Sequence, residues 1–163
     1  MQNKDNRQTI PDDDEKVQAY EKKPIYTVMR AVLRDTNVLV SRMDRGFKYS
    51  LGETLRSVAL ASTEAIFLAY EEREDIVRKA SLIRSISHHL QRLLINYRIS
   101  DELALIPRKS YLVQVERIVS AMRQQEGWLR SIVSQFQNDN GQNQTGLQGG
   151  LGVPLSRTVQ PMR

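Results

Sequence analysis

The chain has 163 residues, which suits one domain with terminal extensions, and a formal net charge of +5 at pH 7. It contains no cysteine, which excludes disulfides and thiolate metal sites and fits a reducing compartment. The longest apolar runs fall far short of the roughly 18 residues that a membrane span needs, and the polar N-terminus lacks the apolar segment of a signal peptide. We therefore expect a cytoplasmic protein with no membrane partner.

Residues 1–23 are polar and include the acidic run from Asp12 to Glu15 after Pro11. This composition predicts a flexible N-terminal arm. A short helix capped by Asp12 or Asp13 is the alternative.

The first clear helix begins at Pro24, because proline at the first helical position sacrifices no intrahelical hydrogen bond. Apolar residues recur at helical spacing from Ile25 to Met43, and Gly46 is expected to end the helix. The opposite face carries Arg30, Arg34 and Arg45.

A second helix is predicted from Ser50 to about Tyr70. Ser50 and Glu53 have the spacing of a capping box, in which each side chain bonds the backbone N–H of the other residue.

The third helix is marked by the acidic cluster Glu71–Asp75, since acids favour a helix N-terminus. From Ile76 to Ser100 no acidic residue occurs. The same stretch carries the basic residues Arg78, Lys79, Arg84, His88, His89, Arg92 and Arg98. All except Lys79 project outside the apolar seam. A helix with cations and no acids on its outer face predicts a polyanionic partner, nucleic acid first.

A fourth helix follows Pro107, with apolar positions continuing to Phe136. Arg108 and Lys109 stand at its N-terminus, where free backbone N–H groups also favour an anion. Residues 137–163 are rich in Gln, Asn and Gly and are predicted to be a disordered tail. Residues 24–136 are therefore expected to form an all-α domain, an antiparallel up-down-up-down four-helix bundle.

Several apolar residues project away from the expected core. They are Val77, Ile95 and Ile99 on the third helix, and Val113 and Trp128 on the fourth. Isolated exposed apolar residues are ordinary, but a tryptophan with several apolar companions favours an oligomer interface.

Two segments carry a family resemblance: Gly46-Phe47-Lys48-Tyr49-Ser50-Leu51-Gly52-Glu53-Thr54-Leu55 and Gly127-Trp128-Leu129. Together with four helices of these lengths, they resemble the accessory variability determinant (Avd) family of diversity-generating retroelements. That four-helix-bundle family includes the proteins encoded in 23S ribosomal RNA intervening sequences. The resemblance covers about residues 25–135 and excludes both tails.

The resemblance implies a basic bundle that assembles into a ring-like homopentamer. In the retroelement branch such a protein binds the reverse transcriptase and its template RNA, and supports synthesis of mutagenized cDNA without catalysing it. In the ribosomal branch, the alternative is a structural oligomer with no polymerase partner. A helical regulatory partner is a third class, for which no residue pattern argues.

Nothing in the sequence favours an enzyme, and we expect no catalytic residue, metal or cofactor. His88 and His89 are adjacent, so their side chains point about 100° apart on a helix and lack the spacing of a helical metal site. Arginine suits phosphate because its guanidinium forms forked hydrogen bonds. The candidate nucleic-acid or polymerase contacts are Arg30, Arg34, Arg45, Arg78, Arg84, His88, Arg92, Arg98, Arg108 and Lys109.

Overall fold

The computed structural model describes residues 20–145, with side chains placed as far as residue 138. Four long helices make up most of it: α2 (Pro24–Ser41), α4 (Glu53–Glu71), α5 (Ile76–Glu102) and α6 (Arg108–Thr145). The short helix α3 (Arg45–Phe47) and the π-helical turn η1 (Lys48–Gly52) join α2 to α4. No strand occurs within the described range, which confirms the predicted all-helical class there.

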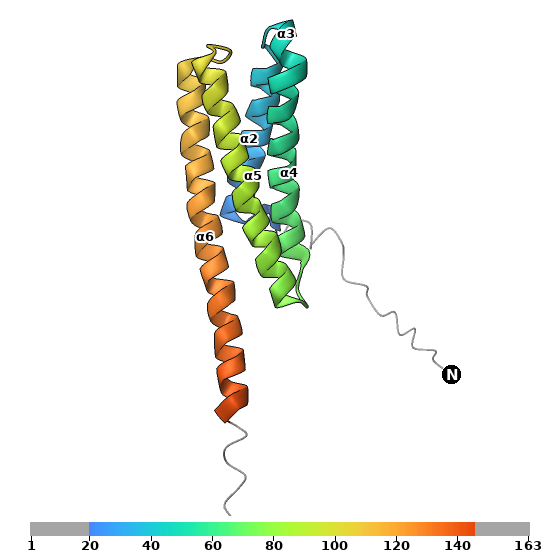
Figure 1. Ribbon diagram of the computed structural model, residues 1–163, viewed down its shortest axis with the longest axis vertical. Coiled ribbons are helices and arrows are strands. Elements are labelled where there is room, and N and C mark those ends of the chain that lie inside the picture. The colour runs from blue at the N-terminus through green and yellow to red at the C-terminus, as the bar shows by residue number, and fades with distance from the viewer. Residues whose placement is uncertain (1–19, 146–163) are drawn as a thin grey trace, which may run out of the picture.

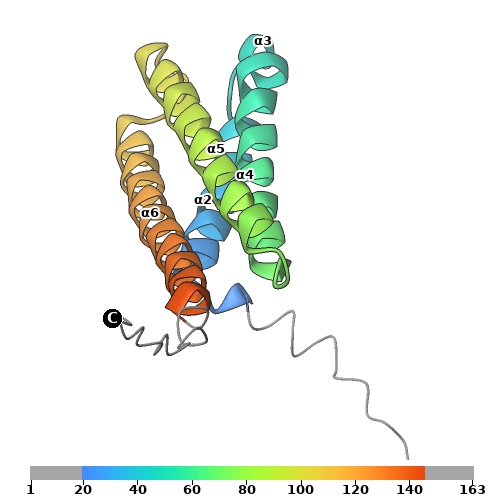
Figure 2. The same ribbon diagram turned by 60° about the horizontal axis from the view of Figure 1, so that its bottom comes forward.

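The four long helices form one bundle (Figure 1). Helix α4 packs against α2 and α5, and α6 packs against α5 and α2, so each helix has two neighbours around a shared core. Figure 1 shows that α6 projects beyond the other three long helices, and Figure 2 shows the same bundle from a second direction. No helix in the described part of the chain is long and apolar enough to cross a membrane.

The core consists of apolar side chains that recur every three or four residues on each helix. The largest fully buried ones include Met29, Val32, Leu55, Ile66, Ile83, Ile86, Leu90, Leu93, Tyr97 and Ile118. Burying one such side chain contributes about 1.5–3 kcal/mol. Packing of these faces, rather than helix propensity, accounts for most of the stability of each helix.

One buried hydrogen bond joins α2 to α5. The hydroxyl oxygens of Thr36 and Tyr97 lie 2.6 Å apart, and both side chains are fully buried. The Thr36 hydroxyl donates its single proton to the Val32 carbonyl at 2.7 Å, so Tyr97 is the donor in the bond between helices. Burial raises the pKa of Tyr97 to about 12.

The junction between the first two long helices differs from the sequence prediction. Helix α2 ends at Ser41 rather than at Gly46, and the chain is helical again from Arg45. Ser50 therefore lies inside a helical stretch, and its hydroxyl bonds the carbonyls of Gly46 and Phe47. The predicted capping box is wrong, because the helical N–H groups it would satisfy already have partners in the preceding turn.

Both ends of the bundle also differ from the predicted boundaries at residues 24 and 136. Helix α6 continues to Thr145, nine residues beyond the expected end at Phe136, so the predicted disordered tail is helical over its first part. At the other end, the Tyr20 ring packs edge-on against Tyr26 at 4.7 Å and Phe67 at 5.0 Å between centroids. The predicted flexibility of residues 1–19 and 146–163, including any helix capped by Asp12 or Asp13, lies outside the described residues.

Gly52 allows the close approach of η1 to α2. A Cβ atom at this position would lie 2.7 Å from Cγ1 of Val40 and 3.3 Å from Sδ of Met43, both in the core. We expect Gly52→Ala to lower the free energy of unfolding by about 1–2 kcal/mol, because overpacking exceeds the gain in helix propensity.

Gly46→Ala is the matched control for Gly52→Ala, since nothing lies within 4 Å of a Cβ there. Urea denaturation of both variants measures the difference. Equal stability of the two variants would contradict the close contact at Gly52.

The buried Tyr97 hydroxyl predicts alkaline sensitivity. Its pKa is raised from 10.0 to about 12 in the folded chain. The protonated hydroxyl therefore contributes to the free energy of unfolding, and this contribution is fully present below pH 10. It is lost as the pH rises towards 12, by up to about 3 kcal/mol. Tyr97→Phe should remove this loss, at a cost near neutral pH of about 1 kcal/mol for the missing hydrogen bond. Urea denaturation of both proteins on each side of pH 10 tests it; parallel losses of stability in the two would exclude Tyr97 as the source.

Candidate nucleic-acid interface

The outer face of α5 combines cations with apolar side chains. Its inner face is buried through Ile83, Leu90 and Tyr97, so residues on the opposite side of the helix turn to solvent. Arg84, His88 and Arg92 are exposed there, and Arg98 is exposed at the edge of the buried face. Val77, Ile95 and Ile99 share the face and are 64%, 55% and 39% exposed.

These residues follow an order along the helix axis. Val77 lies near the start of α5, the cations from Arg84 to Arg92 occupy its middle, and Ile95 and Ile99 lie nearer its end. A rise of about 1.5 Å per residue separates Arg84 from Arg92 by about 12 Å along the axis. The outer face of α5 therefore has a cationic middle between two apolar ends.

Three arginines on α5 have no ion-pair partner among the described residues: Arg84, Arg92 and Arg98. No described carboxylate lies within 4 Å of their guanidinium groups. Their hydrogen-bond donors remain available to an external anion, such as phosphate.

The adjacent histidines differ in environment. His88 is exposed, whereas His89 is half-buried and its Nδ1 has no hydrogen-bond partner in the described structure. Burial, followed by the nearby charges of Arg92 and His88, lowers the pKa of His89. His89 is therefore neutral at pH 7. The part of the chain that the structure describes contains no cluster of three or more metal-binding side chains.

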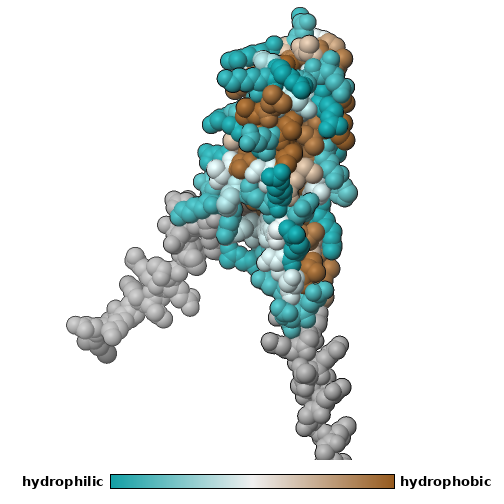
Figure 3. Space-filling view, turned by 90° about the vertical axis from the view of Figure 1, so that its left-hand side faces the viewer, coloured by the Kyte–Doolittle hydropathy of each residue, from teal (hydrophilic) through white to brown (hydrophobic). Residues whose placement is uncertain are grey.

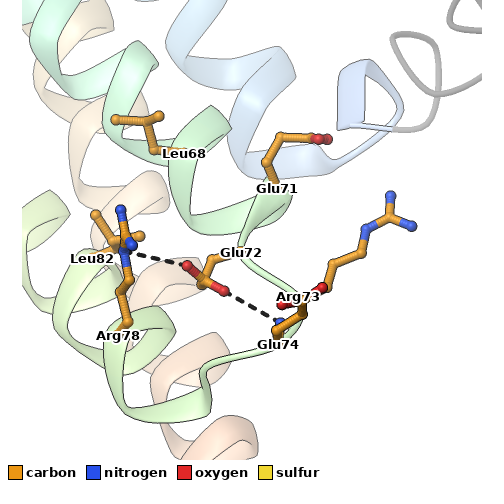
Figure 4. A pocket seen from close by; sticks show the side chains of 7 residues that line it. All are labelled: Leu68, Glu71, Glu72, Arg73, Glu74, Arg78 and Leu82. Atoms are coloured by element: carbon orange, nitrogen blue, oxygen red, sulfur yellow. Dashed lines mark hydrogen bonds and ion pairs between the residues drawn. The ribbon is translucent and has the colours of Figure 1, made fainter.

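Arg78 holds the turn between α4 and α5. Its Nε lies 3.3 Å from the Glu72 carboxylate, which also accepts the backbone N–H group of Glu74 (Figure 4). The same carboxylate accepts the backbone N–H group of Asp75. Asp75 in turn caps α5 by accepting the N–H groups of Val77 and Arg78. The acidic cluster thus starts α5, as its composition predicts, and it engages one of the candidate cations.

Other candidate arginines also have acidic partners. Arg30 approaches Glu21 at 3.9 Å, and Arg34 bonds Asp35 at 3.0 Å. Burial tends to raise the pKa of Asp35, but hydrogen bonds from Arg117 and Arg34 outweigh it and lower this pKa.

At the predicted anion site at the start of α6, one of the two positive charges also has an acidic partner. Arg108 pairs with Asp101 and lies over the Tyr111 ring, 5.0 Å from its centroid. Lys109 and Arg45 are exposed and have no ion pair in the described structure. The structure thus distributes the ten candidates over several faces, and only Arg84, His88 and Arg92 follow one another along one face of a helix.

A second mixed surface lies between α2 and α6. Val38, Leu39 and Val113 line a shallow groove of about 290 Å³, with Arg42 and Lys109 among its polar neighbours. Val113 is 38% exposed, as expected of an interface residue, and Val38, which was not predicted, is 45% exposed. Figure 3, viewed from the α6 side, shows apolar surface interrupted by polar side chains on the half of this face where α6 begins.

Trp128 does not lie on an exposed face, so its predicted place away from the core is wrong. It is half-buried and packs against the core. The buried positions of α6 are Tyr111, Gln114, Ile118, Ala121, Gln125 and Ile132. Trp128 continues this three-and-four spacing, while Phe136, predicted to lie in the seam, is 43% exposed.

The buried face of α6 is hard to predict from the sequence because two of its residues are glutamines. Gln125 is satisfied by donating to the Ile83 carbonyl at 3.0 Å, and Gln114 approaches Asp35 at 3.4 Å. A hydrophobicity pattern alone places both residues outside the core, which rotates the predicted seam away from Trp128.

Comparison with known proteins identifies no relative. No family model, no curated protein and no solved structure matches the chain.

The apolar end of the α5 face predicts an effect on assembly. Replacing Ile95 and Ile99 with aspartate should lower the molar mass measured by light scattering, because charge would enter a desolvated contact. The melting temperature should change little, since both side chains are exposed within one chain.

Leu60→Asp is the control for the aspartate pair, because Leu60 is 47% exposed on a different helix, α4. A parent protein that is monomeric at all concentrations, or an aspartate pair that keeps the parent mass, would exclude the α5 face as an interface.

Proposed function

We propose that this chain is a non-enzymatic accessory subunit of a diversity-generating retroelement. It binds a reverse transcriptase and its template RNA in the cytoplasm and supports mutagenic cDNA synthesis. The resemblance to the accessory variability determinant family supplies the biological setting. The observation that carries the binding proposal is the exposed row of Arg84, His88 and Arg92 on one rigid helix. Arg84 and Arg92 have no acidic partner among the described residues.

Such a row favours phosphate contact over base recognition. Guanidinium groups bind phosphate oxygens in forked pairs, and contacts of this kind position a nucleic acid without selecting its sequence. The regular spacing along α5 keeps the charges in place, so little side-chain ordering is required beyond the arginines themselves.

The proposal includes an antiparallel bundle that assembles into a ring-like homopentamer. The apolar ends of the α5 face and the groove at Val113 provide surfaces for contacts between subunits. A ring repeats the cationic row around its axis, and simultaneous engagement of several rows raises affinity beyond that of one subunit.

The double variant Arg84→Glu, Arg92→Glu tests whether the outer face of α5 binds RNA. The pair should weaken binding to structured RNA at least about 10-fold at low salt, and should reduce the dependence of affinity on salt by about one unit of slope per lost phosphate contact. Fluorescence anisotropy between about 0.05 M and 0.3 M salt measures both quantities. Circular dichroism should be unchanged, since both side chains are exposed.

Arg123→Glu combined with Arg130→Glu is the matched control, because it makes the same change in net charge with two exposed arginines of α6. An equal loss of affinity in the two pairs would mean that only net charge matters. Parent protein whose RNA affinity does not rise on lowering the salt would refute the electrostatic interface.

Co-expression with a reverse transcriptase encoded beside this chain tests whether the chain binds such an enzyme. A complex that survives purification supports the retroelement role. Salt-insensitive self-association, with no polymerase partner, would instead favour the structural oligomer of the ribosomal intervening-sequence branch.

A further inference from the structure

A cavity of about 480 Å³ opens near the end of the bundle where α2 begins and α4 ends. All four long helices contribute to it: Ile25 from α2, Tyr70 from α4, Lys79 from α5, and Trp128 and Ile132 from α6. This volume lies within the range of small-molecule sites. None of the exposed cations of the α5 row lines it.

The inner wall of this cavity is apolar and aromatic. Ile25, Ile66 and Ile132 are buried, and Tyr70 and Trp128 are half-buried beside them. Aromatic side chains of this kind provide flat surfaces for stacking a planar ring. The wall therefore suits a ligand with a flat, largely apolar body.

Two lysines supply positive charge at the same cavity. The Lys23 ammonium lies 5.4 Å from the centroid of the Tyr70 ring. The Lys79 ammonium donates to the Glu72 carbonyl at 2.8 Å, which leaves two of its three donors available. No carboxylate is among the described lining residues, and neither lysine forms an ion pair with a described residue. The cavity is therefore suited to an anion.

Polar groups from α6 complete the lining. Gln124, Ser131 and Gln135 lie on the same helix as Trp128. A glutamine amide offers a donor and an acceptor side by side, which is the pattern that the edge of a nucleobase also presents. A purely aliphatic anion would make no use of these amides or of the aromatic faces.

We infer that this cavity binds one nucleotide, with its base beside Trp128 and Tyr70 and its phosphate at Lys23 and Lys79. Two ligands carry the required planar heteroaromatic base joined to a phosphate: a free nucleotide and the terminal nucleotide of an RNA strand. This site is separate from the α5 row and does not depend on the role proposed for that row.

The only tryptophan of the chain reports binding directly, because Trp128 lines the cavity. Full-length protein is titrated with AMP, UMP, adenosine, inorganic phosphate and a 5′-phosphorylated RNA trinucleotide, with excitation beyond their absorption bands. AMP and UMP should quench the fluorescence saturably at submillimolar concentration. Adenosine and inorganic phosphate should each bind at least about 10-fold more weakly than AMP, since each engages half of the site.

Substitutions separate the cavity from general electrostatics. Lys23→Gln should weaken AMP binding at least about 5-fold, the loss of one charge-assisted contact, and Lys109→Gln is the matched control that should leave it unchanged. Lys79→Gln should weaken AMP binding as well; because it also removes the bond to the Glu72 carbonyl, its melting curve is recorded beside that of Lys23→Gln, which makes no such bond. The Arg84→Glu and Arg92→Glu pair should retain AMP binding even if it loses structured RNA.

Tighter binding of the trinucleotide than of AMP would assign the site to a strand end, and the reverse order to a free nucleotide. Absence of saturable quenching by AMP, UMP and the trinucleotide up to about 5 mM would overturn the inference. Equal affinities of the parent protein and Lys23→Gln for AMP would overturn it too.

Discussion

Burial of one apolar stripe from each of four helices, in a core that all four share, determines where the other side chains point. With about 100° between successive residues of a helix, burying Leu90, Leu93 and Tyr97 turns Arg84 and Arg92 outwards. The cationic row on α5 is thus a geometric consequence of core packing. The hydrogen bond between Thr36 and Tyr97 places a polar contact inside the same core and restricts how α2 and α5 can slide past each other.

Helical class and the approximate extent of the helices were predictable because apolar residues recur at helical spacing along each long helix. The stripe of α6 was not, because Gln114 and Gln125 are buried through contacts with other helices. Their partners, Asp35 and Ile83, lie 79 and 42 residues away in sequence. A local pattern cannot show such compensation, so the sequence places Trp128 away from the core, in an oligomer interface, whereas it packs against the core.

Sequence also could not separate arginines that have an acidic partner in the fold from arginines that have none. Arg108 pairs with Asp101 across the turn between α5 and α6, while Arg84 has no such partner among the described residues. The capping box failed for a related reason: Ser50 has the right spacing to Glu53, but the chain enters a helix earlier, through η1. Local motifs of this length compete with the path that core packing imposes on the chain.

The segmented face of α5 has a thermodynamic consequence. Arg92 lies three residues before Ile95 on the same side of the helix, so a neighbour that covers the apolar end also removes water from the last cation of the row. Binding equilibria that share a surface are reciprocally linked: occupancy of one site changes the affinity of the other by the same factor in both directions. RNA bound to this helix would therefore shift the concentration at which subunits associate, and assembly would set the affinity for RNA.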